Sequence, residues 1–78
     1  MARIVTSMTL TQGVAEHLRN LIHQGAVGPG DRLPPERELA EQLGVARISL
    51  REAIKLLVDD GYVEVRRGAK GGTFITEL

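Results

Sequence analysis

The chain has 78 residues, of which 42% are hydrophobic and 26% charged, and its ten basic and ten acidic residues give a formal net charge of zero. A chain of this length forms one small domain, which buries about 60% of the surface that the unfolded chain exposes. The absence of cysteine excludes disulfide bonds and thiolate zinc sites, and it suits a reducing cytoplasm. The apolar runs are too short to span a bilayer, and the first residues do not resemble a signal peptide. Zero net charge alone argues against a nucleic-acid partner, so the distribution of the charges has to decide.

The first predicted helix starts after Thr9 or Thr11, either of which can cap it, and ends at Gly25. Its apolar stripe, at helical spacing, consists of Val14, Leu18, Leu21 and Ile22. The Gly, Pro and Asp residues at positions 27–31 then predict a turn, because neither a helix nor a strand tolerates that composition. Residues 32–33 are predicted to form a very short strand.

Pro34 and Pro35 predict the first turn of a second helix, where the amide hydrogen that proline lacks would have no partner anyway. Glu36 and Glu38 fall in the same turn, where the helix dipole favours negative charge. The helix is predicted to end at Gly44, in the left-handed conformation that glycine adopts without strain. Its predicted buried face consists of Leu39, Ala40 and Leu43.

A third helix is predicted from about Ala46 to Asp60, and Gly61 ends it. Ser49 and Glu52 also fit a Ser-x-x-Glu capping box, which would start the helix later. The sequence leaves both starts open. The predicted core stripe of this helix consists of Leu50, Ala53, Ile54, Leu57 and Val58.

Arg47, Arg51 and Lys55 form a strip at four-residue spacing, roughly 100° round the third helix from its apolar stripe. Like charges at this spacing cost about 0.2–0.5 kcal/mol per pair, and the helix dipole disfavours cations near the N-terminus. An anionic partner reverses both penalties, and arginine can bind guanine O6 and N7 bidentately in the major groove. The strip therefore predicts a DNA-recognition helix. The alternative is a solvated strip in which Arg51 or Lys55 pairs with Glu52 or Asp59.

A β-hairpin is predicted after the third helix. Residues 62–66 alternate as a half-buried strand does, residues 67–72 form a glycine-rich turn, and residues 73–76 return. The glycines permit positive φ angles and close approach to another surface, so the tip is predicted to lie along a phosphate backbone or in a minor groove. The alternative is a flexible, soluble turn. No acid interrupts the cations of residues 66–72, which are Arg66, Arg67 and Lys70.

The remaining polar and aromatic residues carry no predicted chemistry. Tyr62 and Phe74 are predicted core residues at the base of the hairpin. His17 and His23 have no matched carboxylate cluster, so they are predicted surface or interface residues and not metal ligands. Because the local pattern suggests no histidine base for Ser49, nucleophilic catalysis has no support. We therefore predict no enzyme activity, no metal and no cofactor.

Several motifs of the chain occur together in one known family: PGDRLP at 29–34, ERELA at 36–40, LGV at 43–45, REA at 51–53, GYV at 61–63 and GGTF at 71–74. In this combination they resemble the N-terminal DNA-binding domain of the GntR family of bacterial transcription regulators, and the last motif resembles the FadR-like subgroup. The resemblance implies a winged helix-turn-helix, followed in the whole protein by a C-terminal domain that binds a small metabolite and dimerises. The positions that the resemblance places on DNA are Arg37, Arg47, Arg51, Arg67, Gly68 and Lys70.

Two positions depart from the family pattern. Ala46 stands where a serine or threonine is frequent, which removes one helix cap and one phosphate contact. Ile48 stands where a polar residue is frequent, and it would meet a thymine methyl group or alter which operator is read.

We therefore predict a mainly α fold with a small β-hairpin, a winged helix-turn-helix of three helices and a two- or three-stranded wing over residues 1–78. Its predicted function is sequence-specific binding of double-stranded operator DNA by a bacterial transcription regulator, with the third helix in the major groove. The expected partners are a palindromic operator, a second copy in the full-length dimer and a small-molecule effector bound by the further domain. The alternative is a protein–protein contact module that docks through Leu56 and the wing. The predicted DNA-binding residues are Arg37, Arg47, Ile48, Ser49, Arg51, Lys55, Arg67, Gly68 and Lys70.

Overall fold

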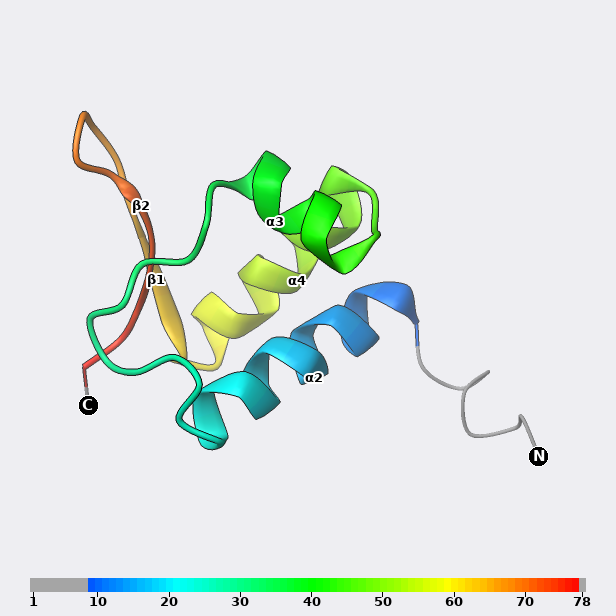
Figure 1. Cartoon of the computed structure of the whole chain (residues 1–78), viewed down its shortest axis with the longest axis horizontal. Helices are drawn as coiled ribbons and strands as arrows, with labels where there is room; N and C mark the ends of the chain where they lie inside the picture. The colour runs from blue at the N-terminus through cyan, green and yellow to red at the C-terminus, as the bar shows by residue number, and fades with distance from the viewer. Residues whose placement is uncertain (1–8, 78) are drawn as a thin grey trace.

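The computed structural model describes residues 9–77 as three helices followed by a β-hairpin (Figure 1). Residues 1–8 and 78, which the predicted domain includes, lie outside that range. The elements are α2 (Leu10–His23), α3 (Glu36–Leu43), α4 (Arg47–Asp59), β1 (Val63–Arg66) and β2 (Gly72–Ile75). This order confirms the predicted winged helix-turn-helix, with α3 and α4 as the helix pair and the hairpin as the wing. None of the helices in residues 9–77 combines the length and hydropathy that a bilayer crossing requires.

Helix α2 begins at a reciprocal cap. The Thr9 hydroxyl accepts a hydrogen bond from the Gln12 amide at 3.0 Å, and the Gln12 side-chain oxygen accepts one from the Thr9 amide at 3.0 Å. Of the two predicted caps, Thr9 is therefore the one used. At the other end the helix stops at His23 with Gln24 as its C-cap, and Gly25, which was predicted to end it, follows with a positive φ.

Helix α3 begins after both prolines. Pro35 is its N-cap, with an extended ψ of 149°, and Glu36 is the first helical residue. The prediction that Pro34 and Pro35 form the first turn is therefore wrong, and one cause is that a residue before proline is pushed out of the helical region. Gly44 ends the helix with φ 71°, where only glycine is free of strain, and it makes possible the tight break before α4.

Helix α4 begins at Arg47, so the later start suggested by the capping box is wrong. Ser49 and Glu52 lie inside the helix. The N-cap is Ala46, whose methyl side chain offers no acceptor for the first amide hydrogens. Arg47 and Arg51 thus belong to the first two turns of a regular helix.

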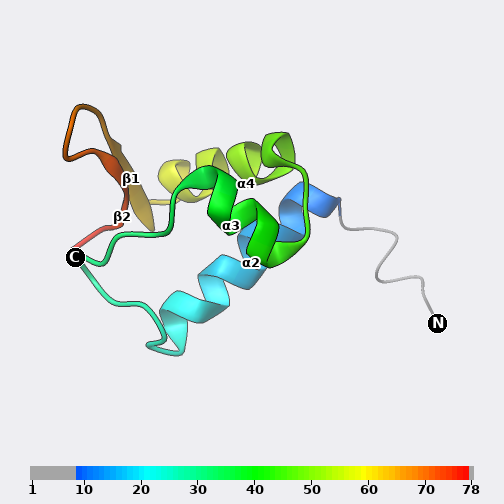
Figure 2. The same cartoon turned by 45° about the horizontal axis from the view of Figure 1, so that its top comes forward.

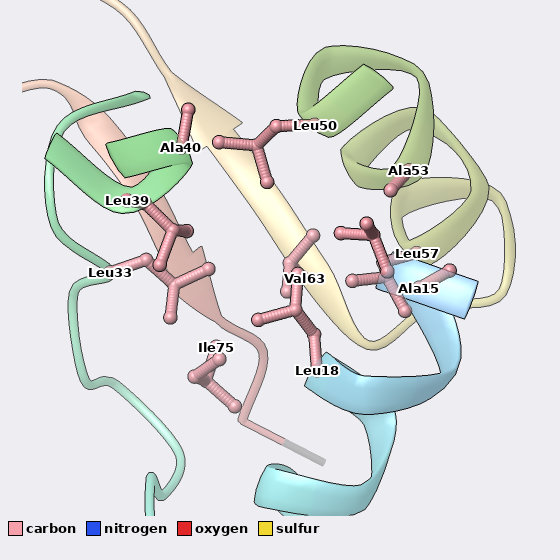
Figure 3. Close-up of a cluster of buried hydrophobic side chains, with 11 residues drawn as sticks. Ala15, Leu18, Leu33, Leu39, Ala40, Leu50, Ala53, Leu57, Val63 and Ile75 are labelled. Atoms are coloured by element: carbon pink, nitrogen blue, oxygen red, sulfur yellow. The ribbon is translucent and has the colours of Figure 1, made fainter. Parts of the chain in front are cut away.

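The core lies where α2, α3, α4 and the hairpin meet (Figure 3). The centre of the core is formed by residues of α4. These are Leu50, Ala53 and Leu57, and none of them has exposed surface. Val58, also predicted in the core, remains 40% exposed because it lines a groove between α4 and the wing. The buried residues are Val14, Ala15, Leu18, Leu33, Leu39, Ala40, Leu50, Ala53, Leu57, Val63 and Ile75.

The wing is a two-stranded antiparallel sheet in which Val63 pairs with Ile75 and Arg66 with Gly72. The predicted short strand at residues 32–33 is present as an isolated bridge between Arg32 and Phe74. The predicted half-buried alternation of the first strand is wrong beyond its first residue, since Val65 is 55% exposed.

The two aromatic residues at the base of the wing are less buried than predicted. Tyr62 is partly buried and packs against the core, whereas Phe74 is partly buried and lies outside the buried cluster. The Arg66 guanidinium covers the Phe74 ring at 4.2 Å from its centroid. A cation above one face of the ring replaces the apolar packing that the sequence suggested.

Candidate nucleic-acid interface

Most of the exposed lysine and arginine side chains of residues 9–77 lie on α4 and on the hairpin, and Arg32 and Arg37 are exposed outside these two elements. In the view of Figure 2, α4 and the hairpin tip both lie along the upper edge of the molecule, and the C-terminal end of α2 lies at the lower edge. We call Arg47, Arg51 and Lys55 the α4 strip, and residues 67–71 the wing tip. These two regions contain six of the nine predicted site residues, Gly68 among them.

Two arginines of the α4 strip share one carboxylate, that of Glu36 at the start of α3. The Arg51 Nε donates to Glu36 Oε2 at 3.1 Å, and a terminal nitrogen of the same guanidinium donates to Oε1 at 2.9 Å. Arg47 donates to Oε1 at 3.4 Å. The left-handed turn at Gly44 folds α4 back past α3, and the first turns of the two helices meet. We call this cluster the Glu36 triad.

The charges of the Glu36 triad reinforce one another. The hydrogen bond from Arg51 is the largest cause of the lowered pKa of Glu36. Desolvation opposes it, and the charges of both arginines together with the hydrogen bond from Arg47 lower the pKa further. The same hydrogen bond raises the pKa of Arg51. Each of these two shifts favours the charged form, and the ionised carboxylate acts only as an acceptor.

The predicted ion-pair alternative for the strip is wrong for Arg51 and correct in part for Lys55. Arg51 pairs with Glu36, which lies 15 residues earlier in the chain, and not with Glu52 or Asp59. Lys55 approaches Glu52 at 3.9 Å, close to the limit for an ion pair. The α4 strip also carries less uncompensated charge than its sequence indicates, because Glu36 offsets one of its positive charges. Two arginines and one carboxylate still leave the triad positive.

Sequence reasoning missed Glu36 as a site residue and assigned it only to the helix dipole. The signal was present, since an acid in the first turn of the second helix precedes arginines in the first turns of the third. Helical periodicity does not give the angle at which two helices cross. It therefore could not predict that the first turns of α3 and α4 are in contact.

The other predicted residues of the helix pair are spread around the triad. Ile48 projects from α4 with 59% of its surface exposed, and Ser49 is partly buried. Arg37 is exposed on α3 and lines a separate hollow with Glu38 and Glu41, so it is not brought together with the triad.

The wing tip carries cations without acids. Arg67 and Lys70 are exposed, and neither forms an ion pair with any residue in the described range 9–77. The Gly71 amide donates to the Gly68 carbonyl at 2.9 Å and closes the turn. A side chain on Gly71 would clash with the backbone carbonyl of Arg66, so this position requires glycine. Arg66, predicted with these cations, instead pairs with Glu64 within its own strand.

A groove of about 520 Å³ separates α4 from the wing. Its lining brings Arg51, Lys55 and Arg67 together across the gap, although these residues come from two different elements. Two acids, Glu36 and Asp59, also reach it. The apolar part of the lining includes Ile54, Val58 and Val65. Cations on both sides of a groove can hold a polyanion that crosses from the helix to the wing.

The two histidines lie away from this surface. His17 is exposed on α2, as predicted. His23 is exposed too, and its Nε2 shares a hydrogen bond of 3.0 Å with the Tyr62 hydroxyl. This contact ties the end of α2 to the base of the wing.

A basic recognition helix behind a glycine break, followed by a basic hairpin, defines a winged helix-turn-helix. The chain belongs to the gntR family of bacterial regulatory proteins, whose family profile matches residues 10–75. These are regulatory proteins and not enzymes.

Two relatives illustrate the similarity. The chain is 53% identical over 58 residues to the Uxu operon transcriptional regulator of Escherichia coli K12, which covers 74% of this chain and 23% of that protein. It is 45% identical over 64 residues to the HTH-type transcriptional regulator Mce2R of Mycobacterium tuberculosis, which covers 82% of this chain and 27% of that protein. The chain thus spans about a quarter of the length of these curated relatives.

Two solved structures that share the fold contain operator DNA. The crystal structure of AraR(DBD) in complex with operator ORX1 superposes with a TM-score of 0.80 at 35% identity, covering 88% of this chain and 81% of that one. A second complex, with operator ORR3, gives a TM-score of 0.78 at 37% identity over 86% of this chain and 78% of that one.

Proposed function

We propose that this chain is the sequence-specific operator-binding part of a bacterial transcription regulator. The observation that carries the proposal is the pair Arg47 and Arg51, which stand with more than half of each side chain exposed on the first two turns of α4. An α-helix with its side chains is about 10–12 Å across, and the major groove of B-DNA is about 12 Å wide. The operator complexes of AraR(DBD), at 35% and 37% identity, support duplex DNA as the ligand.

The α4 strip supplies the contacts that distinguish one base sequence from another. Arg47 and Arg51 bind guanine edges, where each good bidentate pair gives about 1–3 kcal/mol of discrimination. Ile48 packs on a thymine methyl group, and Ser49 donates to a phosphate or a base edge. Lys55 lies one turn further along the strip and binds the flanking phosphates.

The remaining contacts fix the duplex without reading it. Arg37 and the wing-tip residues Arg67 and Lys70 neutralise phosphates, and such contacts set position and affinity but carry no sequence information. Gly68 lets the wing-tip backbone approach the sugar-phosphate chain or the minor groove, because no Cβ stands in the way.

The whole protein is proposed to bind a palindromic operator as a homodimer in the cytoplasm. Its half-sites would lie about one helical turn of DNA apart or closer. A further domain in the remaining length would bind a small-molecule effector and hold the dimer, as in the FadR-like subgroup. Because one winged helix meets one half-site, the isolated chain binds more weakly than the dimer does.

Selection from a random duplex pool, followed by a salt titration, tests the proposal. The chain should enrich a defined half-site, and its affinity should fall by orders of magnitude between about 50 and 200 mM salt, because several phosphates release their counterions. The rival is a protein-docking module that uses Leu56 and the wing. Enrichment of no sequence, together with an affinity for duplex that is insensitive to salt, would favour that rival.

A further inference from the structure

We infer that Glu36 is a specificity determinant: it orients Arg51 toward base edges and lowers the affinity of the α4 strip for DNA of other sequences. The inference rests on the proposed operator binding and concerns how that same site chooses among duplexes. An acidic residue in a surface that binds a polyanion can orient an arginine and repel phosphates, and a basic residue in the same place could do neither.

The hydrogen bonds between Glu36 and Arg51 fix the direction of the guanidinium. A guanidinium has five N–H donors in a rigid plane. Glu36 accepts from the Nε of Arg51 and from one of its terminal nitrogens, so the carboxylate occupies the side edge of the fork. The outer end of the fork keeps its donors. That end matches O6 and N7 of guanine, and it is held in place before any DNA arrives.

Glu36 also reduces the positive charge at the start of α4. Without Glu36 the first two turns of α4 would present two full positive charges, from Arg47 and Arg51, to any phosphate. The carboxylate removes one of them, and it stays charged because both arginines lower its pKa. Its side chain is 31% exposed, so its field reaches the surface that faces the ligand. Every duplex has phosphates, whereas only some duplexes have a guanine at the base pair that Arg51 faces. Repulsion of phosphates by Glu36 therefore lowers the affinity for all duplexes, and only those with that guanine regain affinity through the contact with Arg51.

The wing tip differs from the α4 strip, because there the same polyanion is met by cations that have no acidic partner within residues 9–77. If Glu36 served only to reduce repulsion between neighbouring cations, we would expect an acid beside Arg67 and Lys70 as well. A carboxylate instead accompanies the arginines of the helix, which are the ones proposed to touch bases.

The test compares Glu36→Gln with the parent chain on two duplex probes of equal length. One is the duplex that the parent chain selects from a random pool, and the other is a scrambled duplex of the same composition. Removing the carboxylate adds one effective positive charge, so affinity for the scrambled duplex should rise severalfold and its salt slope should steepen by about 0.9. The ratio of the two affinities should fall by about tenfold, since alignment of Arg51 is lost as well.

Two further variants separate this role from general effects. Glu38→Gln removes the other acid in the first turn of α3, with the same change in net charge and helix-dipole contribution, and Glu38 pairs with neither arginine. It should leave the ratio almost unchanged. Glu36→Asp keeps the charge but shortens the reach to Arg51. It should lose affinity for the selected duplex while affinity for the scrambled one stays low.

Each result decides the inference. A ratio that stays constant in Glu36→Gln, whether both affinities change equally or neither changes, overturns it, as does an equal fall in Glu38→Gln. If Glu36→Gln does not fold properly, the test uses only the affinities of Glu36→Asp and the parent chain for the selected and scrambled duplexes. Failure of the parent chain to prefer any duplex sequence would instead refute the proposed function, so the two failures are distinguishable.

Discussion

Arg47 and Arg51 lie on a helix and share the carboxylate of Glu36, whereas Arg67 and Lys70 lie on a glycine-rich turn and pair with no acid in residues 9–77. Both regions are basic and exposed, and Arg51 from the helix and Arg67 from the turn line the same groove between α4 and the wing. Donors that are fixed in direction can distinguish one base from another, while unpaired cations on a pliable turn attract any phosphate. The difference indicates that the helix supplies selectivity and the wing supplies affinity.

The largest expected effect comes from removing the arginine that Glu36 holds most closely. Arg51→Ala should cost about 1–3 kcal/mol of affinity for the selected duplex and relax the preference at one base pair. Its effect on a scrambled duplex should be smaller. Fluorescence anisotropy titrations with the two duplexes measure both values.

Arg51→Lys is the matched control for that prediction. It keeps the charge but loses the planar fork, and an ammonium group cannot contact the carboxylate and a guanine with two parallel hydrogen bonds each. Binding to the scrambled duplex should therefore persist while discrimination falls. Full discrimination by the lysine variant would show that Arg51 acts only through its charge.

The second prediction changes the shape of the wing tip and leaves its charge intact. Gly71→Ala places a methyl group against the Arg66 carbonyl, so the turn has to shift. We expect the free energy of unfolding to drop by roughly 1 kcal/mol or more, as for other misplaced side chains. Affinity for both duplexes should fall by a similar factor. Thermal melts and anisotropy provide the measurements, and Ala69→Gly, in the same turn, should change stability by less than about 0.5 kcal/mol.

The third prediction removes one charge from the wing tip. Lys70→Ala should weaken binding to the selected and scrambled duplexes about equally, and it should flatten the salt slope by about one. Affinities measured at several salt concentrations give that slope. A loss confined to the selected duplex would mean that the wing reads sequence, and the contrast between the two regions would disappear.

The smallest effect concerns stability and pH. The folded-state pKa of Glu36 is lowered, so its ion pairs contribute fully above the ordinary pKa of a glutamic acid, and the contribution is lost as pH falls through the lowered value. Because the pairs are partly exposed, the contribution is about 0–1 kcal/mol. Glu36→Gln should therefore melt slightly lower than the parent chain at neutral pH and equally in acid. Calorimetry at several pH values tests this, and a difference that persists in acid would contradict it.

The order of elements followed from local signals in the sequence. Turn residues at 27–31, the glycine at position 44 and the period-two pattern after Gly61 each mark a boundary that depends only on neighbouring residues. The membership of Arg47, Arg51 and Lys55 in one exposed strip also followed, since helical periodicity is a local property. The sequence was therefore sufficient to predict which basic residues of the third helix are exposed.

What depends on the packing of separate elements could not be predicted. The contact between Glu36 and Arg51 requires the angle between α3 and α4. Val58 has the period of a core residue, but no element covers it, because the wing stands away from that side of α4. Arg66 has the sequence context of a free cation, yet Glu64 on the same strand neutralises it.

The measurement that tests the account most directly is an NMR titration of the chain that follows the side-chain Nε–H signals of Arg47 and Arg51 together with the wing-tip amides. The selected and scrambled duplexes are added separately. The account predicts that the wing-tip amides shift with both duplexes, while the Arg51 Nε–H signal reaches a distinct position only with the selected one. Arginine signals that respond identically to both duplexes, or shifts confined to α2 and Leu56, would contradict it.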